Sequence, residues 1–271
     1  MNKQSLITEA RQYATTITER ELGYLYDDML TSGCSLQEIA AKWKTHVLAL
    51  ASGRPLQYVT RLAHFYGTTF YVDEAVLIPR PETEELVHML IQECKSSDIT
   101  APRILDVGTG SGCIPITLQM ALPESMTTAV DVSVEALTVA RKNATAHTVE
   151  IDIKQVDFTD PEARSSLSHY DIIVSNPPYI PKKEKRLMHE NVLAHEPHVA
   201  LFVEDEDPLL FYRLVGEFGL SHLASGGLVA LELNEYNAQQ VASLYESFGY
   251  SSVQIHQDLQ GKDRILSARL A

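Results

Sequence analysis

The sequence has few cysteines and no long apolar run, and each shortage excludes a class of protein. The three cysteines among its 271 residues, Cys34, Cys94 and Cys113, include no CxxC pair, so neither a disulfide framework nor a zinc or other metal site is expected. Such a small number of cysteines, without a pairing motif, is typical of proteins in a reducing compartment. No apolar run reaches the roughly 18 residues of a membrane span, and the opening MNKQSLITEA lacks an export signal. We expect a cytoplasmic protein with no membrane partner.

Basic residues are also scarce, with 22 Lys and Arg against 36 Asp and Glu and a formal net charge of −14. Binding to phosphate backbones depends on basic surfaces, so no direct nucleic-acid binding is expected. Residues 1–72 carry 7 basic and 6 acidic residues, whereas residues 73–271 carry 15 and 30. The basic cluster Lys182-Lys183-Glu184-Lys185-Arg186 predicts either a surface that attracts an acidic partner or a solvated loop.

The first third of the chain is predicted to be helical and then to form a hairpin. Apolar residues at helical spacing predict helices over 6–17, 22–30 and 36–47, and Ser35 and Glu38 form a capping box before the third. Residues 64–78 read HFYGTTFYV followed by AVLI, which predicts a β-hairpin. Pro79-Arg80-Pro81 ends the strand, and Pro81 begins a helix.

The remainder alternates between strands and helices. The strand candidates are RILDV, TTAVDV, DIKQV, DIIVSN and GLVALEL, and apolar helical stretches lie at 113–121, 133–146 and 208–224. This alternation predicts an α/β fold with a doubly wound, mostly parallel sheet. VQIHQD and RILSARL, joined by QGKD, predict an edge hairpin in which the last of seven strands is antiparallel.

A glycine-rich segment follows the first strand of this sheet. It reads Asp106-Val107-Gly108-Thr109-Gly110-Ser111-Gly112 and leads into a helix whose first N–H groups are free. Asp131 ends the next strand, 19 residues after Gly112, where a carboxylate accepts the hydroxyls of a ribose. The pattern predicts a nucleoside-containing cofactor, with a purely structural turn as the alternative.

The spacing of this loop favours S-adenosylmethionine over NAD. The third glycine departs from the dinucleotide fingerprint GxGxxG, and the carboxylate of Asp106 suits a cationic ligand better than a pyrophosphate. After the third strand, Asp157 is predicted to accept the adenine amine and Phe158 to pack on the ring. The alternative for this pair is a capping aspartate and a core phenylalanine.

A second motif, Asn176-Pro177-Pro178-Tyr179, ends the fourth strand. The side-chain carbonyl of Asn176 and the backbone carbonyl of Pro177 offer two acceptors to a planar NH2 group, and Tyr179 offers a face for stacking. The motif predicts methylation of a conjugated nitrogen, either an exocyclic base amine or a side-chain amide. A rigid turn is the structural alternative.

Together these residues resemble the HemK/PrmC family, the peptide chain release factor N5-glutamine methyltransferases. The resemblance runs from about Gly53 to the C-terminus through GRPLQYV, VLIPRPETEELV, LDVGTGSGCIPI, SNPPYIP, Glu196-Pro197 and DLQGKDRILSARL. It implies cofactor binding by Gly108–Gly112, Asp131 and Phe158, and contacts from Asn176–Tyr179 to both cofactor and glutamine. Arg80 is predicted to contact the substrate.

The resemblance also implies the activity and the division of the chain. The expected reaction is methyl transfer to the glutamine of the Gly-Gly-Gln loop of class 1 release factors. The alternatives are an adenine-N6 or guanine-N2 nucleic-acid methyltransferase, a dinucleotide-dependent oxidoreductase, and a non-catalytic homologue that docks a partner. We predict a helical substrate-recognition domain at 1–60, shorter than is usual in the family, a hairpin linker at 61–80 and a class I S-adenosylmethionine-dependent methyltransferase domain at 81–271.

Overall fold

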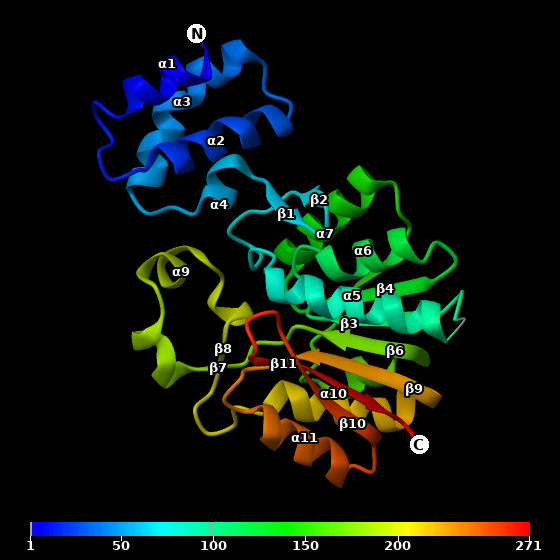
Figure 1. Ribbon diagram of the computed structural model, residues 1–271. Coiled ribbons are helices and arrows are strands. Elements are labelled where there is room, and N and C mark those ends of the chain that lie inside the picture. Colours follow the sequence, from blue (N-terminus) through cyan, green and yellow to red (C-terminus); the bar gives the residue numbers. More distant parts are fainter. Residues whose placement is uncertain (1, 98) are drawn as a thin grey trace.

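A computed structural model describes residues 2–97 and 99–271, beginning with a bundle of helices that leads into a larger α/β part (Figure 1). The first four helices are α1 (Lys3–Ala10), α2 (Glu19–Thr31), α3 (Leu36–Ala51) and α4 (Leu56–Thr60). Capping boxes begin α2 at Thr18 and α3 at Ser35, as predicted for α3. The first helix is shorter than predicted and ends at Ala10.

These helices enclose a hydrophobic cluster of their own. Trp43 is 2% exposed, and its indole nitrogen donates a hydrogen bond to the carbonyl of Leu6 at 3.0 Å. Leu22 and Leu25 of α2 are fully buried against it. Ala14 and Ile17 also belong to this cluster, although they lie beyond the end of α1. Burial of this face holds the bundle together.

A short hairpin of β1 (Ala63–Phe65) and β2 (Thr68–Phe70) follows. Its turn is Tyr66-Gly67, with φ of 47° and 76°. The predicted hairpin is therefore present, but its extension through AVLI at 75–78 is wrong, because that segment forms no strand. The carbonyl of Val76 instead accepts a hydrogen bond from the Tyr58 hydroxyl at 2.6 Å, so the segment is held by a helix rather than by a sheet.

The central sheet has seven strands in the order β10-β11-β9-β6-β3-β4-β5. Their bounds are β3 (Arg103–Val107), β4 (Met126–Asp131), β5 (Asp152–Gln155), β6 (Tyr170–Ser175), β9 (Leu223–Glu232), β10 (Ser251–Gln257) and β11 (Asp263–Arg269). The last strand, β11, is antiparallel to both β9 and β10, and the other pairs are parallel. The predicted fold class is confirmed.

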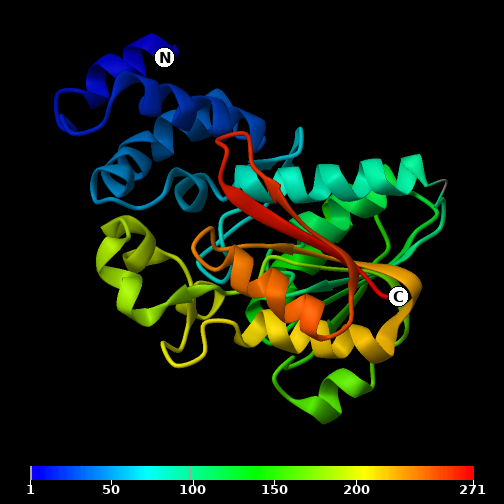
Figure 2. The same cartoon turned by 60° about the horizontal axis from the view of Figure 1, so that its bottom comes forward.

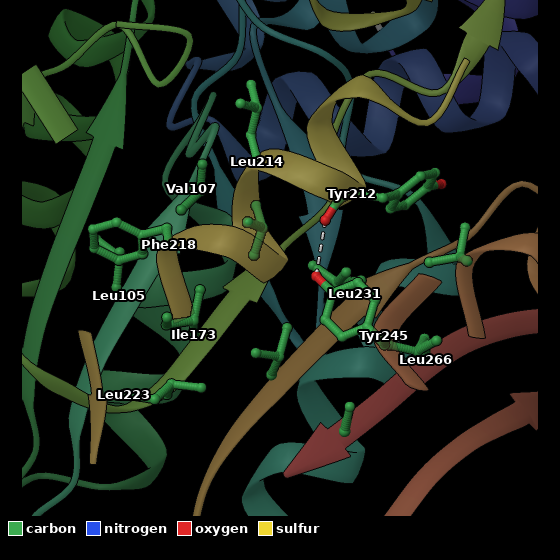
Figure 3. Close-up of a cluster of buried hydrophobic side chains, with 14 of the residues drawn as sticks. Leu105, Val107, Ile173, Tyr212, Leu214, Phe218, Leu223, Leu231, Tyr245 and Leu266 are labelled. Carbon is green, nitrogen blue, oxygen red and sulfur yellow. Dashed lines mark hydrogen bonds between the residues drawn. The ribbon is translucent and has the colours of Figure 1, made fainter. Parts of the chain in front are cut away.

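Helices cover both faces of the sheet (Figures 1 and 2). One face carries α5 (Pro81–Ser96), α6 (Cys113–Ala121) and α7 (Val134–His147), and the other carries α8 (Pro161–Ser165), α10 (Leu210–His222) and α11 (Ala238–Ser247). Successive strand residues alternate between the faces, so Ile104 packs under α5 and α6 while Leu105 packs under α10. Figure 3 shows the hydrophobic cluster between the sheet and helices α10 and α11. In it the Tyr245 hydroxyl donates a hydrogen bond to the Tyr212 carbonyl at 3.0 Å.

Between β6 and α10 the chain makes an excursion beside the N-terminal helices (Figure 1). It contains β7 (Ile180–Pro181), the 3-10 helix η1 (Lys182–Leu187), α9 (Glu190–His195), the 3-10 helix η2 (His198–Ala200) and β8 (Phe202–Val203). A side chain at Gly53 would lie 2.7 Å from Oδ1 of Asn191, so the excursion touches the loop after α3. Within the described residues, no helix is both long and apolar enough to cross a membrane.

Candidate active site

A cavity of about 330 Å³ lies at the carboxyl ends of β3, β4, β5 and β6, where open α/β sheets bind ligands. Most of the predicted site residues line it together. They are Arg80, Gly108, Thr109, Gly110, Ser111, Asp131, Asp157, Phe158, Asn176, Pro177 and Pro178. The other three predicted residues, Asp106, Gly112 and Tyr179, lie behind this lining, where their effect on the cavity is indirect.

The glycine loop turns sharply between β3 and α6. The amides of Gly108 and Thr109 both donate to the carbonyl of Val130, at 2.9 and 3.0 Å. Gly112 is the N-cap of α6, with φ of 79°, and a Cβ there would lie 3.0 Å from Ile116 and 3.2 Å from Ala140. Glycine is therefore required for the close approach of α6 to α7.

Asp131 closes the loop from the neighbouring strand. Its Oδ2 accepts a hydrogen bond from the amide of Gly110 and its Oδ1 from the amide of Ser133, both at 2.9 Å. Burial raises the pKa of Asp131, although these amides oppose the shift. Each carboxylate oxygen has more than one lone-pair site, so the side chain retains acceptor capacity toward the cavity.

Asp106 is a fully buried carboxylate beneath the same loop. Neither of its oxygens has a hydrogen-bond partner among the described residues, and the nearby Thr109 hydroxyl is likewise without one. Burial raises the pKa of Asp106 to about 7, the neighbouring Thr109 hydroxyl opposes this shift, and the charge of Asp131 adds to it. A buried polar group without a partner is rare and marks a candidate ligand site.

Phe158 and Asp157 form the wall of the cavity beyond β5. Phe158 is 5% exposed and packs edge-on against Phe218 at a centroid distance of 5.2 Å. Oδ1 of Asp157 accepts hydrogen bonds from the amide and the hydroxyl of Thr159, at 2.8 and 2.6 Å. Both residues thus have the structural roles that the alternative interpretation predicts, and both also face the cavity.

Asn176 is held from behind by two side chains that the sequence analysis did not assign to the site. Its Nδ2 donates to Oγ1 of Thr83 at 3.0 Å, and the Thr83 hydroxyl donates to Glu232 at 2.6 Å. The Tyr179 hydroxyl also donates to Glu232, at 3.2 Å. Burial, followed by the charge of Glu232, raises the pKa of Tyr179. Tyr179 therefore braces the loop in this structure rather than presenting its ring to the cavity.

Arg80 is paired with a buried carboxylate. Its guanidinium lies 2.6 and 2.7 Å from the two oxygens of Glu196, whose side chain is 2% exposed. The pair joins the VLIPRPETE segment to the excursion after β6, which places Val199 and Ala200 at the cavity. The pairing defines the position of Arg80 and ties two sequence motifs 116 residues apart.

Asn143 of α7 was also missed by the sequence analysis. Its side chain is 1% exposed, and its Nδ2 donates to the carbonyls of Ser111 and Tyr71 at 2.8 and 2.9 Å. Its Oδ1 accepts from the Tyr71 amide at 2.8 Å. An asparagine in the apolar face of a helix was the available signal, because a buried amide needs partners.

The basic cluster after Tyr179 is partly neutralised by the acidic segment at 204–207. Lys182 forms an ion pair with Glu204, and the amide of Lys183 donates to Asp205 at 2.8 Å. The Lys185 ammonium lies 4.5 Å from the ring centroid of Phe202. These contacts tie the loop to the acidic segment, while the side-chain charges of Lys183 and Arg186 form no ion pair among the described residues.

Comparison with known proteins defines the class first. A family model described as Methyltransferase small domain matches residues 83–201. The 16S rRNA N2 G1207 methyltransferase of T. Thermophilus, whose structure was solved in complex with AdoMet and guanosine, is similar in fold, with a TM-score of 0.55. It is 16% identical, and the match covers 78% of this chain and 50% of that one. The fold is that of a class I methyltransferase.

Curated relatives then define the family. The release factor glutamine methyltransferase of Flavobacterium psychrophilum is 43% identical over 226 residues, which cover 83% of this chain and 79% of the relative. That of Bacteroides thetaiotaomicron is 42% identical over 245 residues, which cover 90% and 85%. The chain belongs to the family of release factor glutamine methyltransferases.

Proposed function

We propose that this protein transfers a methyl group from S-adenosylmethionine to the side-chain amide nitrogen of the glutamine in the Gly-Gly-Gln loop of class 1 peptide chain release factors. The observation that carries the proposal is the position of Asn176 and Pro177 at the cavity, beside the glycine loop. The amide of Asn176 is anchored through its nitrogen, which leaves its carbonyl oxygen as an acceptor. The names of the curated relatives support the same substrate.

The residues around the cavity suit S-adenosylmethionine. We propose that the glycine loop, Asp131 and Phe158 hold its nucleoside part, and that Asp106 provides negative charge for its cationic part. The unpaired, buried carboxylate of Asp106 supports this assignment, since a cation stabilises a carboxylate that burial destabilises. When bound, S-adenosylmethionine supplies an electrophilic methyl group on a sulfonium.

The protein's own part in the reaction is alignment. An amide nitrogen is a poor nucleophile because its lone pair is delocalised, so its orientation toward the methyl group is the main requirement. The carbonyl oxygens of Asn176 and Pro177 are the proposed acceptors for the two amide hydrogens. These acceptors also favour the positive charge that develops on the nitrogen during transfer.

We also propose a protein partner without direct nucleic-acid binding, in the cytoplasm. The net charge of −14 and the ion pair of Lys182 with Glu204 support the absence of direct nucleic-acid binding. The three unpaired cysteines support the proposed cytoplasmic location. Residues 1–60 are the proposed recognition domain for the release factor, and 61–80 the linker to the methyltransferase domain.

Transfer of label tests the proposed substrate. We expect labelled S-adenosylmethionine to methylate an intact class 1 release factor and to leave its Gly-Gly-Gln loop variant Gln→Ala unlabelled. The readout is label in the separated protein bands together with the mass of the modified loop peptide. Label in both substrates, or in neither, would contradict the proposal.

The pH dependence of stability, compared between the wild type and Asp106→Asn, tests the proposed role of Asp106 at the cofactor site. The pKa of Asp106 in the folded protein is about 7, against 3.8 ordinarily, so the folded state binds the extra proton between these values. Stability therefore rises as pH falls from 7 toward 4, and the cost of the buried charge is fully present above pH 7. At pH 8 we expect Asp106→Asn to raise the free energy of unfolding by about 2–4 kcal/mol.

The same variant should bind S-adenosylmethionine more weakly, because the ligand's positive charge loses its partner. Urea unfolding at pH 5 and pH 8 measures the change in the free energy of unfolding, and calorimetry measures the affinity for S-adenosylmethionine. Glu124→Gln, which removes an exposed carboxylate, is the control and should change neither quantity. Unchanged affinity in Asp106→Asn would exclude the proposed electrostatic contribution of Asp106.

A further inference from the structure

The VLIPRPETE segment contains Thr83 as well as Arg80, and Thr83 lies directly behind Asn176. Thr83 occupies the third position of α5, is 2% exposed and lines the cavity. Its Oγ1 is the hydrogen-bond partner of Asn176 Nδ2, at 3.0 Å. The start of α5 therefore supports the residue on which methyl transfer depends.

Glu232 completes the arrangement from the end of β9. It is 1% exposed, and each of its carboxylate oxygens accepts one hydroxyl: Oε2 that of Thr83 and Oε1 that of Tyr179. One carboxylate thus holds the first and the last residue of the Asn-Pro-Pro-Tyr loop, the first of them through Thr83.

Counting hydrogens determines which way the Asn176 amide faces. A hydroxyl has one hydrogen, and when Glu232 is ionised that of Thr83 goes to its carboxylate. The Thr83 oxygen can therefore only accept, so Asn176 must direct its NH2 group toward Thr83 and keep its carbonyl oxygen for the cavity. The two ends of an asparagine amide are nearly equal in shape. Without this constraint the side chain could turn its NH2 group toward the substrate amide, where two donors would meet.

We propose that Thr83 and Glu232 are positioning residues that fix the orientation of the Asn176 amide so that its carbonyl oxygen accepts from the glutamine substrate. This inference rests on the proposed function of the site. Neither residue is proposed to touch the reacting atoms, and both act through Asn176.

Removing the Thr83 hydroxyl without changing the side-chain shape tests the proposal. For Thr83→Val we expect kcat for release factor methylation to fall about 10- to 100-fold, with the Kd of S-adenosylmethionine changed less than about threefold. Thr83→Ser keeps the hydroxyl and should restore kcat to within about threefold of the wild type. Thr117→Val is the matched control, because Thr117 is also a buried threonine but its hydroxyl has no partner among the described residues.

A double variant separates positioning from a general structural effect. If Thr83 acts through Asn176, then Thr83→Val adds less than about twofold to the loss caused by Asn176→Ala, since residues in one network are not additive. Losses that multiply would overturn the proposal, as would a Thr83→Val kcat equal to that of Thr83→Ser. These outcomes require an active wild-type enzyme, whereas failure of the proposed function would appear as a wild type that leaves release factor unlabelled.

Discussion

Replacing Asn176 with alanine is expected to lower kcat for release factor methylation by about 10²- to 10³-fold. The substitution removes the side-chain carbonyl that is proposed to hold one hydrogen of the glutamine amide, and Pro177 alone does not define the orientation of a planar group. The Kd of S-adenosylmethionine should rise by less than about tenfold, because the glycine loop and Asp131 remain in place. Single-turnover kinetics and calorimetry measure the two quantities separately.

Asn237→Ala provides the control for this experiment. Asn237 precedes α11, and its side chain makes no capping hydrogen bond among the described residues, so its replacement removes an asparagine without removing a helix cap. It should retain the kcat of the wild type. If Asn176→Ala weakened cofactor binding as much as it lowered kcat, then Asn176 would serve the cofactor and not the glutamine.

The second large effect concerns stability of the N-terminal helices. Leu25→Ala is expected to lower their free energy of unfolding by about 2–5 kcal/mol, because Leu25 is fully buried beside Trp43. Trp43 is the single tryptophan of the chain and lies in this cluster, so its fluorescence reports on these helices. The midpoint of the fluorescence transition in urea should move to lower concentration.

Leu30→Ala is the control, since Leu30 lies in the same helix but is 43% exposed. Its midpoint should move by less than a quarter of the shift of Leu25→Ala. Binding of S-adenosylmethionine should be equal in both variants at a concentration of urea where the wild type is folded. An unchanged midpoint for Leu25→Ala would show that the cluster around Trp43 contributes little to holding the bundle together.

Much of the fold follows from local patterns in the sequence. β3 and β6 are short apolar runs, and the spacing of Gly108, Gly110 and Gly112 before a helix identifies the turn at the cavity. The helix limits were less predictable. Ala14 and Ile17 are packed in the hydrophobic cluster as expected, yet they lie outside α1, because periodicity reports which residues are buried and not the backbone that buries them.

The long-range contacts of the site could not be predicted. Arg80 was recognised as a candidate, but its buried partner Glu196 is 116 residues away, and no local pattern links them. Thr83 and Glu232 likewise meet only because α5 packs beside β9. The predicted roles of the site residues stay predictions that the variants above address, and the division at residues 60 and 80 also stays a prediction.

The spacing of these contacts along the chain has a consequence for biosynthesis. The hydrogen bond from Gly110 to Asp131 spans 21 residues, whereas the one from Thr83 to Glu232 spans 149. A chain made from its N-terminus can close the glycine loop long before Glu232 has left the ribosome, and contacts between distant residues form late. The contact that closes the glycine loop therefore needs only a local segment of the chain, whereas the support of Asn176 through Thr83 requires β9 and so nearly the whole chain.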